Sequence, residues 1–127
     1  MIVVDTSAFI AIVLREPSAS MCMKVLETET DIVVSAGTVA EALIVAGRRR
    51  VTDEMLRLLE GLAVEIASVT PASARRIAQA YGQWGKGVHR AGLNFGDCFA
   101  YALAKERSCP LLFVGDDFSK TDIAGVL

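Results

Sequence analysis

Short runs of aliphatic residues recur along the chain and alternate with longer stretches whose apolar side chains are spaced three and four positions apart. Runs of the first kind are typical of buried strands in parallel sheets, and stretches of the second kind are typical of amphipathic helices. The short runs predict strands at residues 1–4, 31–35, 63–69 and 110–115. The longer stretches predict helices at residues 8–16, 17–28, 36–50, 52–62, 70–84 and 94–108.

This alternation of strands with helices indicates an α/β fold in which helices cover both faces of a largely parallel sheet. Thr70 and Pro71 support one predicted helix, because threonine is a preferred N-cap and proline fits the first helical position. Residues 82–92 contain four glycines and predict a mobile loop before the last helix. No internal repeat or linker interrupts the pattern, so we expect one domain.

Hydrophobic residues make up 53% of the 127 residues, which raises the question of a membrane protein. The apolar run at residues 8–14 is far shorter than the roughly 20 residues that a membrane-spanning helix needs. No basic segment precedes this run, so we expect no cleavable signal peptide. The cysteines, Cys22, Cys98 and Cys109, form no CxxC pair. Their spacing argues against a zinc site or a disulfide framework and favours the reducing cytoplasm.

The net charge of −2 gives no overall positive field that would indicate nucleic-acid binding. Three local clusters of basic residues nevertheless stand out: Arg48 to Arg50, the pair Arg75 and Arg76, and Lys86 with His89 and Arg90. Each cluster is compatible with a solvated surface and with contacts to phosphate groups. A nearby catalytic centre would favour the second interpretation.

Acidic residues occur where the predicted strands end. Asp5 follows the first strand, and Asp116 and Asp117 follow the last. Asp97 lies in the first turn of the helix before that last strand, and Glu41 lies inside the helix after the second strand. Because ligands of open parallel sheets bind outside the carboxyl ends of the strands, these acids could converge on one site.

Such convergence is unfavourable unless something offsets the mutual repulsion of the carboxylates and their desolvation. A divalent cation would do so, and an all-oxygen ligand set favours Mg²⁺ or Mn²⁺ over zinc. Ordinary structural roles are also compatible with each acid taken singly. Asp5 is a suitable N-cap, Asp97 suits the positive end of a helix, Glu41 could be surface-exposed, and Asp116 and Asp117 are common turn residues.

Three segments, in this order, resemble the PIN-domain ribonucleases, and specifically the VapC-type toxins of toxin–antitoxin pairs. They are "MIVVDTSAFIAIVLREP" at the amino terminus, "SAGTVAEAL" in the middle, and "GLNFGDCFAYALAKERSCPLLFVGDDFSKTDI" near the end. The resemblance implies a single PIN-like domain over residues 1–127 with a three-layer α/β/α fold. It also implies a Mg²⁺- or Mn²⁺-dependent endoribonuclease that commonly forms a homodimer and is inhibited by a small antitoxin protein.

Carried over by position, Asp5, Glu41 and Asp97 match the first three acids of the family. The fourth acid is either Asp116 or Asp117, and we expect Asp116 because it comes first after the strand. On this basis Asp5 and Asp97 are the expected metal ligands. Glu41 and Asp116 would bind a second ion or hold its waters.

Thr6 and Ser7 match hydroxyl positions of the family, where they would orient Asp5 or a water on the metal. Lys86 and Arg90, just before the Asp97 helix, are the expected contacts to the RNA substrate, because the acids themselves repel phosphate. Trp84 either stacks on a base or anchors the loop.

Two other functional classes are alternatives to a nuclease for this sequence. A phosphoaspartyl hydrolase would need a second aspartate two residues later, where this chain has Ser7. A catalytically silent PIN-like binding module would not need the acids that this chain retains.

Overall fold

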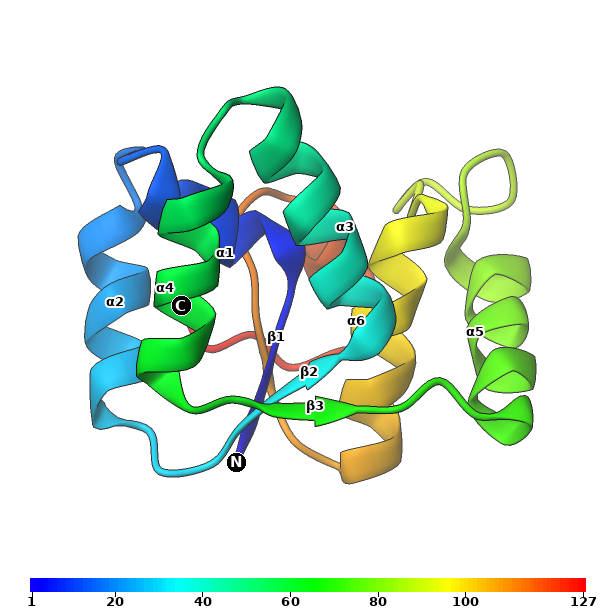
Figure 1. Cartoon of the computed structure of the whole chain (residues 1–127). Coiled ribbons are helices and arrows are strands. Elements are labelled where there is room, and N and C mark those ends of the chain that lie inside the picture. Colours follow the sequence, from blue (N-terminus) through cyan, green and yellow to red (C-terminus); the bar gives the residue numbers. More distant parts are fainter.

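Four short strands form one parallel sheet in the spatial order β3–β2–β1–β4. Figure 1 labels the first three of them. The structure is a computed structural model that describes all 127 residues. The strands are β1 (Ile2–Val4), β2 (Ile32–Ser35), β3 (Glu65–Ala67) and β4 (Leu111–Leu112). Because β1 is followed by β2 on one side and has β4 on the other, the strand order reverses between β1 and β4. Ligands of open α/β sheets bind at such a point.

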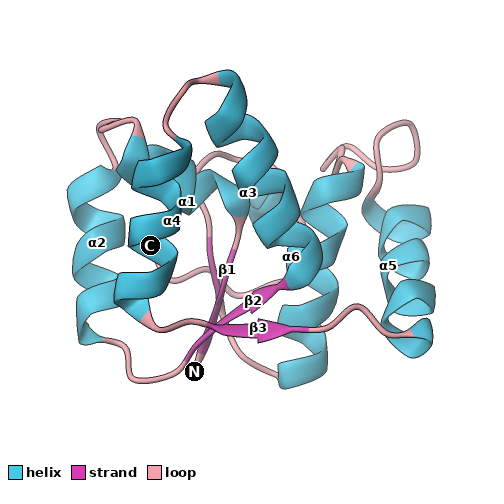
Figure 2. Ribbon diagram, viewed as in Figure 1, coloured by secondary structure: helices cyan, strands magenta, loops and turns pink.

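Pairs of helices connect successive strands and form the two outer layers. Figure 2 shows helices on both sides of the sheet, with α5 and α6 on the side opposite α2 and α4. The predicted three-layer α/β/α architecture is therefore confirmed. No helix has the length and apolar character needed to cross a membrane. The helices are α1 (Thr6–Val13), α2 (Ala19–Thr28), α3 (Ala36–Arg48), α4 (Thr52–Leu62), α5 (Pro71–Trp84) and α6 (Phe95–Arg107), followed by the 3₁₀ turn η1 (Phe118–Lys120).

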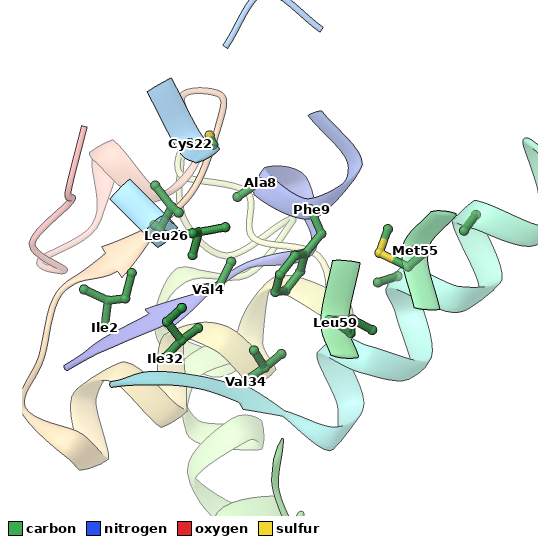
Figure 3. Packing of buried hydrophobic residues seen from close by; sticks show 13 residues of the cluster. Ile2, Val4, Ala8, Phe9, Cys22, Leu26, Ile32, Val34, Met55 and Leu59 are labelled. Atoms are coloured by element: carbon green, nitrogen blue, oxygen red, sulfur yellow. The ribbon is translucent and has the colours of Figure 1, made fainter. Parts of the chain in front are cut away.

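Alternate residues of the central strands contribute to two separate cores. Ile2 and Val4 of β1 pack with Phe9 and Met55 in the core shared by α1 to α4 (Figure 3). Val3, between them, belongs to the core on the α5 and α6 side. Successive side chains of a strand point to opposite faces, so a strand with helices on both sides must be apolar at every position. This explains the uninterrupted aliphatic runs of the sequence.

The structural elements differ from the predicted ones mainly at their ends. The first helix begins at Thr6 because Asp5 caps it, and the second begins at Ala19, after Pro17. The predicted strand 110–115 pairs only at Leu111 and Leu112. Its ladder ends there because the Val114 N–H donates to the Ser7 hydroxyl, at 3.0 Å. The chain therefore leaves the sheet where the acidic residues begin.

Helices α3 and α6 approach each other closely at two glycines. A Cβ atom on Gly37 of α3 would overlap the ring of Phe99 on α6. A Cβ atom on Gly96 of α6 would overlap the carboxylate of Glu41 on α3. These contacts bring Glu41 against the first turn of α6, where Asp97 lies.

Candidate active site

Asp5 is the most buried acid of the site, with only 3% of its surface exposed. Its Oδ2 accepts hydrogen bonds from the Ser7 N–H (3.0 Å) and the Ser7 hydroxyl (2.6 Å), and the first of these caps α1. Its Oδ1 is buried and has no hydrogen-bond partner. Asp5 is therefore both an N-cap and a carboxylate with one unused buried oxygen, a combination that capping alone does not explain.

Burial raises the pKa of Asp5 to about 6, because desolvation disfavours the charged carboxylate. The hydrogen bonds from Ser7 oppose this rise, and the negative charge of Glu41 adds to it. The hydrogen bond from Thr6, the residue after Asp5, to Glu41 likewise places the start of α1 against α3.

Asp97 occupies the third position of α6 and forms a capping box with Asn94. The Asp97 N–H donates to the Asn94 side chain at 2.8 Å, and the Asn94 N–H donates to the Asp97 carboxylate at 3.0 Å. Its pKa is raised to about 7, first by burial and then by the negative charges of Asp5, Asp117 and Glu41. Asp97 is therefore electrostatically coupled to acids from three other segments.

Glu41 is held by the hydroxyl of Thr6, which donates to its Oε1 at 2.6 Å. The Thr6 hydroxyl also lies 3.5 Å from the carbonyl oxygen of Thr38. The hydroxyls of Thr6 and Ser7 thus act on different acids, since Ser7 contacts Asp5 and Thr6 contacts Glu41. The expectation was that they orient Asp5 or a metal-bound water, and of the two side chains it is Ser7 that contacts Asp5.

Asp116 and Asp117 are both exposed and follow β4, as the sequence indicated. The charge of Asp117 raises the pKa of Asp97. The carbonyl oxygen of Asp116 accepts a hydrogen bond from the Ser119 hydroxyl. Asp117 is therefore close enough to Asp97 for its charge to act on that carboxylate.

No cationic side chain forms an ion pair with Asp5, Glu41, Asp97 or Asp117. The five ion pairs of the chain lie elsewhere, at Met1–Glu29, Glu54–Arg57, Arg76–Glu106, Lys105–Asp122 and Glu65–Arg107. The acids that converge at the end of β1 thus lack a positively charged partner from the protein itself.

A partly hydrated divalent cation fits this arrangement. No group of three or more His, Cys, Asp or Glu side chains is arranged to hold a metal ion. Mg²⁺ is commonly bound by only one or two carboxylates and keeps several of its waters. Asp5, whose Oδ1 accepts no hydrogen bond, and Asp97 offer oxygen ligands of this kind.

The glycine-rich segment between α5 and α6 carries Lys86 and Arg90, both exposed. The segment is closed by backbone hydrogen bonds, including Lys86 N–H to Leu93 O (2.9 Å) and Leu93 N–H to Trp84 O (3.0 Å). The Trp84 indole N–H donates to the Tyr101 hydroxyl at 2.9 Å. Its ring packs edge-on against His89, with 4.7 Å between centroids. Trp84 is thus engaged as an anchor of the loop.

Sequence reasoning missed three residues of the site. Asn94 could have been found from the N-x-x-D pattern of a capping box. Gly96 and Thr38 gave no local signal, because their importance comes from contacts between helices. Thr38 has a buried hydroxyl without a hydrogen-bond partner, and its carbonyl oxygen lies next to Thr6.

Comparison with known proteins identifies the class to which this fold and site belong. The family model of the PIN domain matches residues 2–124, so the chain belongs to the PIN-domain family.

Its relatives narrow this assignment further. Ribonuclease VapC30 of Mycobacterium tuberculosis is 41% identical over 127 residues, covering 98% of this chain and 97% of that protein. The crystal structure of VapC20 of M. tuberculosis, described as a sarcin–ricin loop cleaving toxin, superimposes with a TM-score of 0.81 at 16% identity, over 99% and 98% of the two chains. The crystal structure of VapBC-5 of M. tuberculosis, a member of the VapBC family of toxin–antitoxin systems, superimposes with a TM-score of 0.63 at 26% identity. The match covers 97% of this chain and 91% of that one. The expected membership of the PIN-domain family, with VapC-type proteins as relatives, is thereby confirmed.

Proposed function

We propose that this VapC-type protein is the ribonuclease toxin of a toxin–antitoxin pair and cleaves RNA endonucleolytically at the acidic site, with Mg²⁺ or Mn²⁺ bound by Asp5 and Asp97. One observation carries the proposal. Asp5 is almost fully buried, and its Oδ1 accepts no hydrogen bond. The acids around it have no cationic partner either, so their mutual repulsion is not offset by the protein. A divalent cation would satisfy that oxygen and offset the repulsion.

The bound cation would supply charge neutralisation at the phosphate and help to activate water. The residues of this chain would hold it and keep the site in position. Ser7 fixes Asp5 by two hydrogen bonds, and Asn94 fixes Asp97 by two more. Thr6 holds Glu41 in place to orient a water or a second cation.

For the fourth acid we propose Asp117, with Asp116, the first expectation from the sequence, as the alternative. The support is that the negative charge of Asp117 is one of those that raise the pKa of Asp97. Asp117→Asn should lower the cleavage rate at least about 10-fold, by analogy with other groups that support metal ligands. Asp116→Asn should change it less, and the reverse order would restore Asp116 to this role.

Lys86 and Arg90 are the proposed contacts to the RNA backbone. Both are exposed and belong to the segment that leads into α6. The proposed protein partners are a small antitoxin and a second copy of the chain. VapBC-5, one of the similar structures, is described as a member of a toxin–antitoxin family. Exposed apolar side chains such as Met21 of α2 and Leu56 of α4 would suit such partners.

The alternatives gain no support. Ser7 stands where a phosphoaspartyl hydrolase needs its second aspartate, and its hydroxyl is engaged with Asp5 and with the Val114 N–H. The acids that a silent binding module could lose are all present.

The proposal is tested by incubating the purified protein with total RNA in Mn²⁺, Mg²⁺ or EDTA and mapping the new ends. We expect cleavage in either metal and none in EDTA. Asp5→Asn and Asp97→Asn should each lower cleavage by more than about 100-fold while the circular dichroism spectrum stays native. Cleavage that persists in EDTA or in purified Asp97→Asn protein, with contaminating nucleases excluded, would contradict it.

A further inference from the structure

A groove of about 380 Å³ lies between α3 and α6, beside the acidic site. Glu41 and Arg48 both line it, from positions that are about 10 Å apart along the axis of α3. Ile44 and Phe95 contribute apolar walls, and Phe99 lies against Gly37. Because Glu41 belongs to both, the groove is continuous with the proposed catalytic site.

Phe95 is unusual among the large apolar residues. Its exposed fraction is 69%, and Ile44, in the same groove, is 57% exposed. Phe95 is the first residue of α6 and precedes Asp97 by two positions. Its ring packs edge-to-face on Phe99, with 4.9 Å between centroids. Packing therefore holds the ring in place while most of it remains open to solvent.

We infer that this groove is a nucleobase subsite, in which a base next to the cleaved bond stacks on Phe95 and the adjoining phosphate contacts Arg48. The inference rests on the proposed function, because it assigns the nucleotide next to the reacting phosphate. Proteins that bind single-stranded nucleic acid combine aromatic platforms with cationic groups that follow the backbone. The groove offers both elements, and its wall is shared with an acid of the site.

The distribution of charge favours RNA over an apolar protein segment as the occupant. The negative charge of Glu41 repels phosphate groups, so an RNA strand that passes Glu41 would need a nearby cation. Arg48 supplies this cation, two turns away on the same face of α3. Trp84, the aromatic residue closest in sequence to the basic loop, has its indole N–H and ring occupied by Tyr101 and His89. Phe95 is thus the aromatic side chain beside the acids that remains free to stack.

The test measures binding of a single-stranded RNA that contains 2-aminopurine, whose fluorescence falls when the base stacks. Binding is measured in EDTA, so that it does not depend on cleavage. Phe95→Ala should weaken binding about 5- to 150-fold and abolish the fluorescence change. Phe95→Tyr keeps an aromatic ring and should retain both the RNA affinity and the fluorescence change. Ile66→Ala, a matched truncation of an exposed apolar residue on β3, should leave both the affinity and the fluorescence change as in wild type.

A second pair of variants tests the phosphate contact. Arg48→Ala should reduce the dependence of log K on log salt concentration by about 0.7, the contribution of one phosphate in a single strand. Arg57→Ala, an exposed arginine on α4, is the control and should leave the slope unchanged.

Two results would overturn the subsite. One is a loss of binding below about threefold in Phe95→Ala, which is less than stacking provides. The other is a loss that follows dissociation of a dimer in light scattering, as expected if a second copy covers the groove. A failure of the proposed function would look different, because wild-type protein would then not cleave RNA in either metal, whatever the result in EDTA.

Discussion

Ser7 illustrates how one side chain can connect three parts of this site. Its hydroxyl donates to Asp5 Oδ2 and accepts from the Val114 N–H, so it joins the end of β1, the start of α1 and the segment after β4. It also lowers the pKa of Asp5 against the larger effect of burial. Ser7 therefore favours the ionised form of a buried carboxylate and holds the segment that leads to Asp116 and Asp117.

Replacing Ser7 by alanine should consequently affect both activity and stability. Without the hydroxyl, the pKa of Asp5 should rise further above about 6, so the acid limb of the pH–rate profile should move to higher pH. The free energy of unfolding should fall by about 1–2 kcal/mol, since the Val114 N–H loses its partner. A pH–rate profile and urea unfolding measure the two effects.

Ser35→Ala provides the matched control. Ser35 is also a buried N-cap, and its hydroxyl accepts from the Gly37 N–H at 3.2 Å, but it contacts no acid of the site. The Ser35→Ala variant should have a lower free energy of unfolding, but the acid limb of its pH–rate profile should not shift. An acid limb that stays in place in Ser7→Ala would contradict the role assigned to Ser7.

At the level of single residues, the sequence indicated the acids that the structure brings together, but it did not indicate their hydrogen-bond partners. Asp5 and Asp97 stand at the ends of apolar segments, where local pattern reveals them. The contact of Thr6 with Glu41 joins residues 35 positions apart, and no local pattern encodes it. The choice between Asp116 and Asp117 likewise depends on how the chain turns after β4.

At the level of elements, the contact between α3 and α6 positions two acids relative to each other. Gly96→Ala places a methyl group where the Glu41 carboxylate now lies and should push that carboxylate away from Thr6. Cleavage should fall roughly 10- to 100-fold, because small displacements of catalytic groups are costly. Stability should hardly change, because alanine favours a helix by up to about 1 kcal/mol over glycine and this gain offsets the cost of displacing the Glu41 carboxylate.

The measurement is single-turnover cleavage together with thermal unfolding. Gly61→Ala in α4 is the control, because a Cβ atom there would meet nothing within 4 Å. It should keep full activity. Equal activities of the two alanine variants would show that Glu41 does not need its present position.

The loop before α6 is tied to the carboxyl-terminal segment through Tyr101. The Tyr101 hydroxyl accepts from Trp84 and donates to Asp122 at 2.6 Å. Tyr101→Phe removes both hydrogen bonds and should raise the KM for RNA while kcat stays nearly constant, because the loop carries Lys86 and Arg90 but no acid. Asp122→Asn should have a smaller effect, since its amide oxygen can still accept. A change confined to kcat would be inconsistent with this role.

Elements were predictable in kind and approximate place because their patterns are local. The helix 52–62 was predicted at its observed bounds, since its leucines follow the helical period. The predicted strand 63–69 forms only Glu65–Ala67, at the exposed edge of the sheet. Strand length at an edge is decided by the neighbouring strand, which the local pattern does not contain.

On the scale of the whole molecule, the order of the strands determines why the acids meet. Because β1 lies between β2 and β4, the segments that follow β1 and β4 leave the sheet side by side. Asp5 therefore lies beside Glu41 of α3 and Asp97 of α6, and the charge of Asp117, from the segment after β4, acts on Asp97. The sequence indicated a parallel sheet, but the order of its strands results from packing across the entire chain.

This assembly of acids should make the metal-free protein less stable as pH rises. Asp5 and Asp97 have pKa values of about 6 and about 7 in the folded protein, against an ordinary value of 3.8. Between those values the folded state binds more protons than the unfolded state, so the free energy of unfolding decreases with pH. Their contribution is fully present below about pH 4 and is lost as pH rises through about 6 and 7.

Chemical unfolding in EDTA at pH 5 and pH 8 measures this loss. The side chain of Asp5→Asn is neutral at both pH values, so this variant avoids the part of the loss that comes from Asp5. From pH 5 to pH 8 its free energy of unfolding should therefore rise by roughly 1–3 kcal/mol relative to that of wild type. Mg²⁺ should counteract the loss, because a bound cation stabilises the ionised carboxylates. At about 100 times its Kd it should add about 2.7 kcal/mol to wild type at pH 8, and much less at pH 5, where protons compete. Identical pH dependence in wild type and Asp5→Asn, or equal stabilisation of both by Mg²⁺, would mean that the buried carboxylate of Asp5 neither carries this charge nor binds the cation.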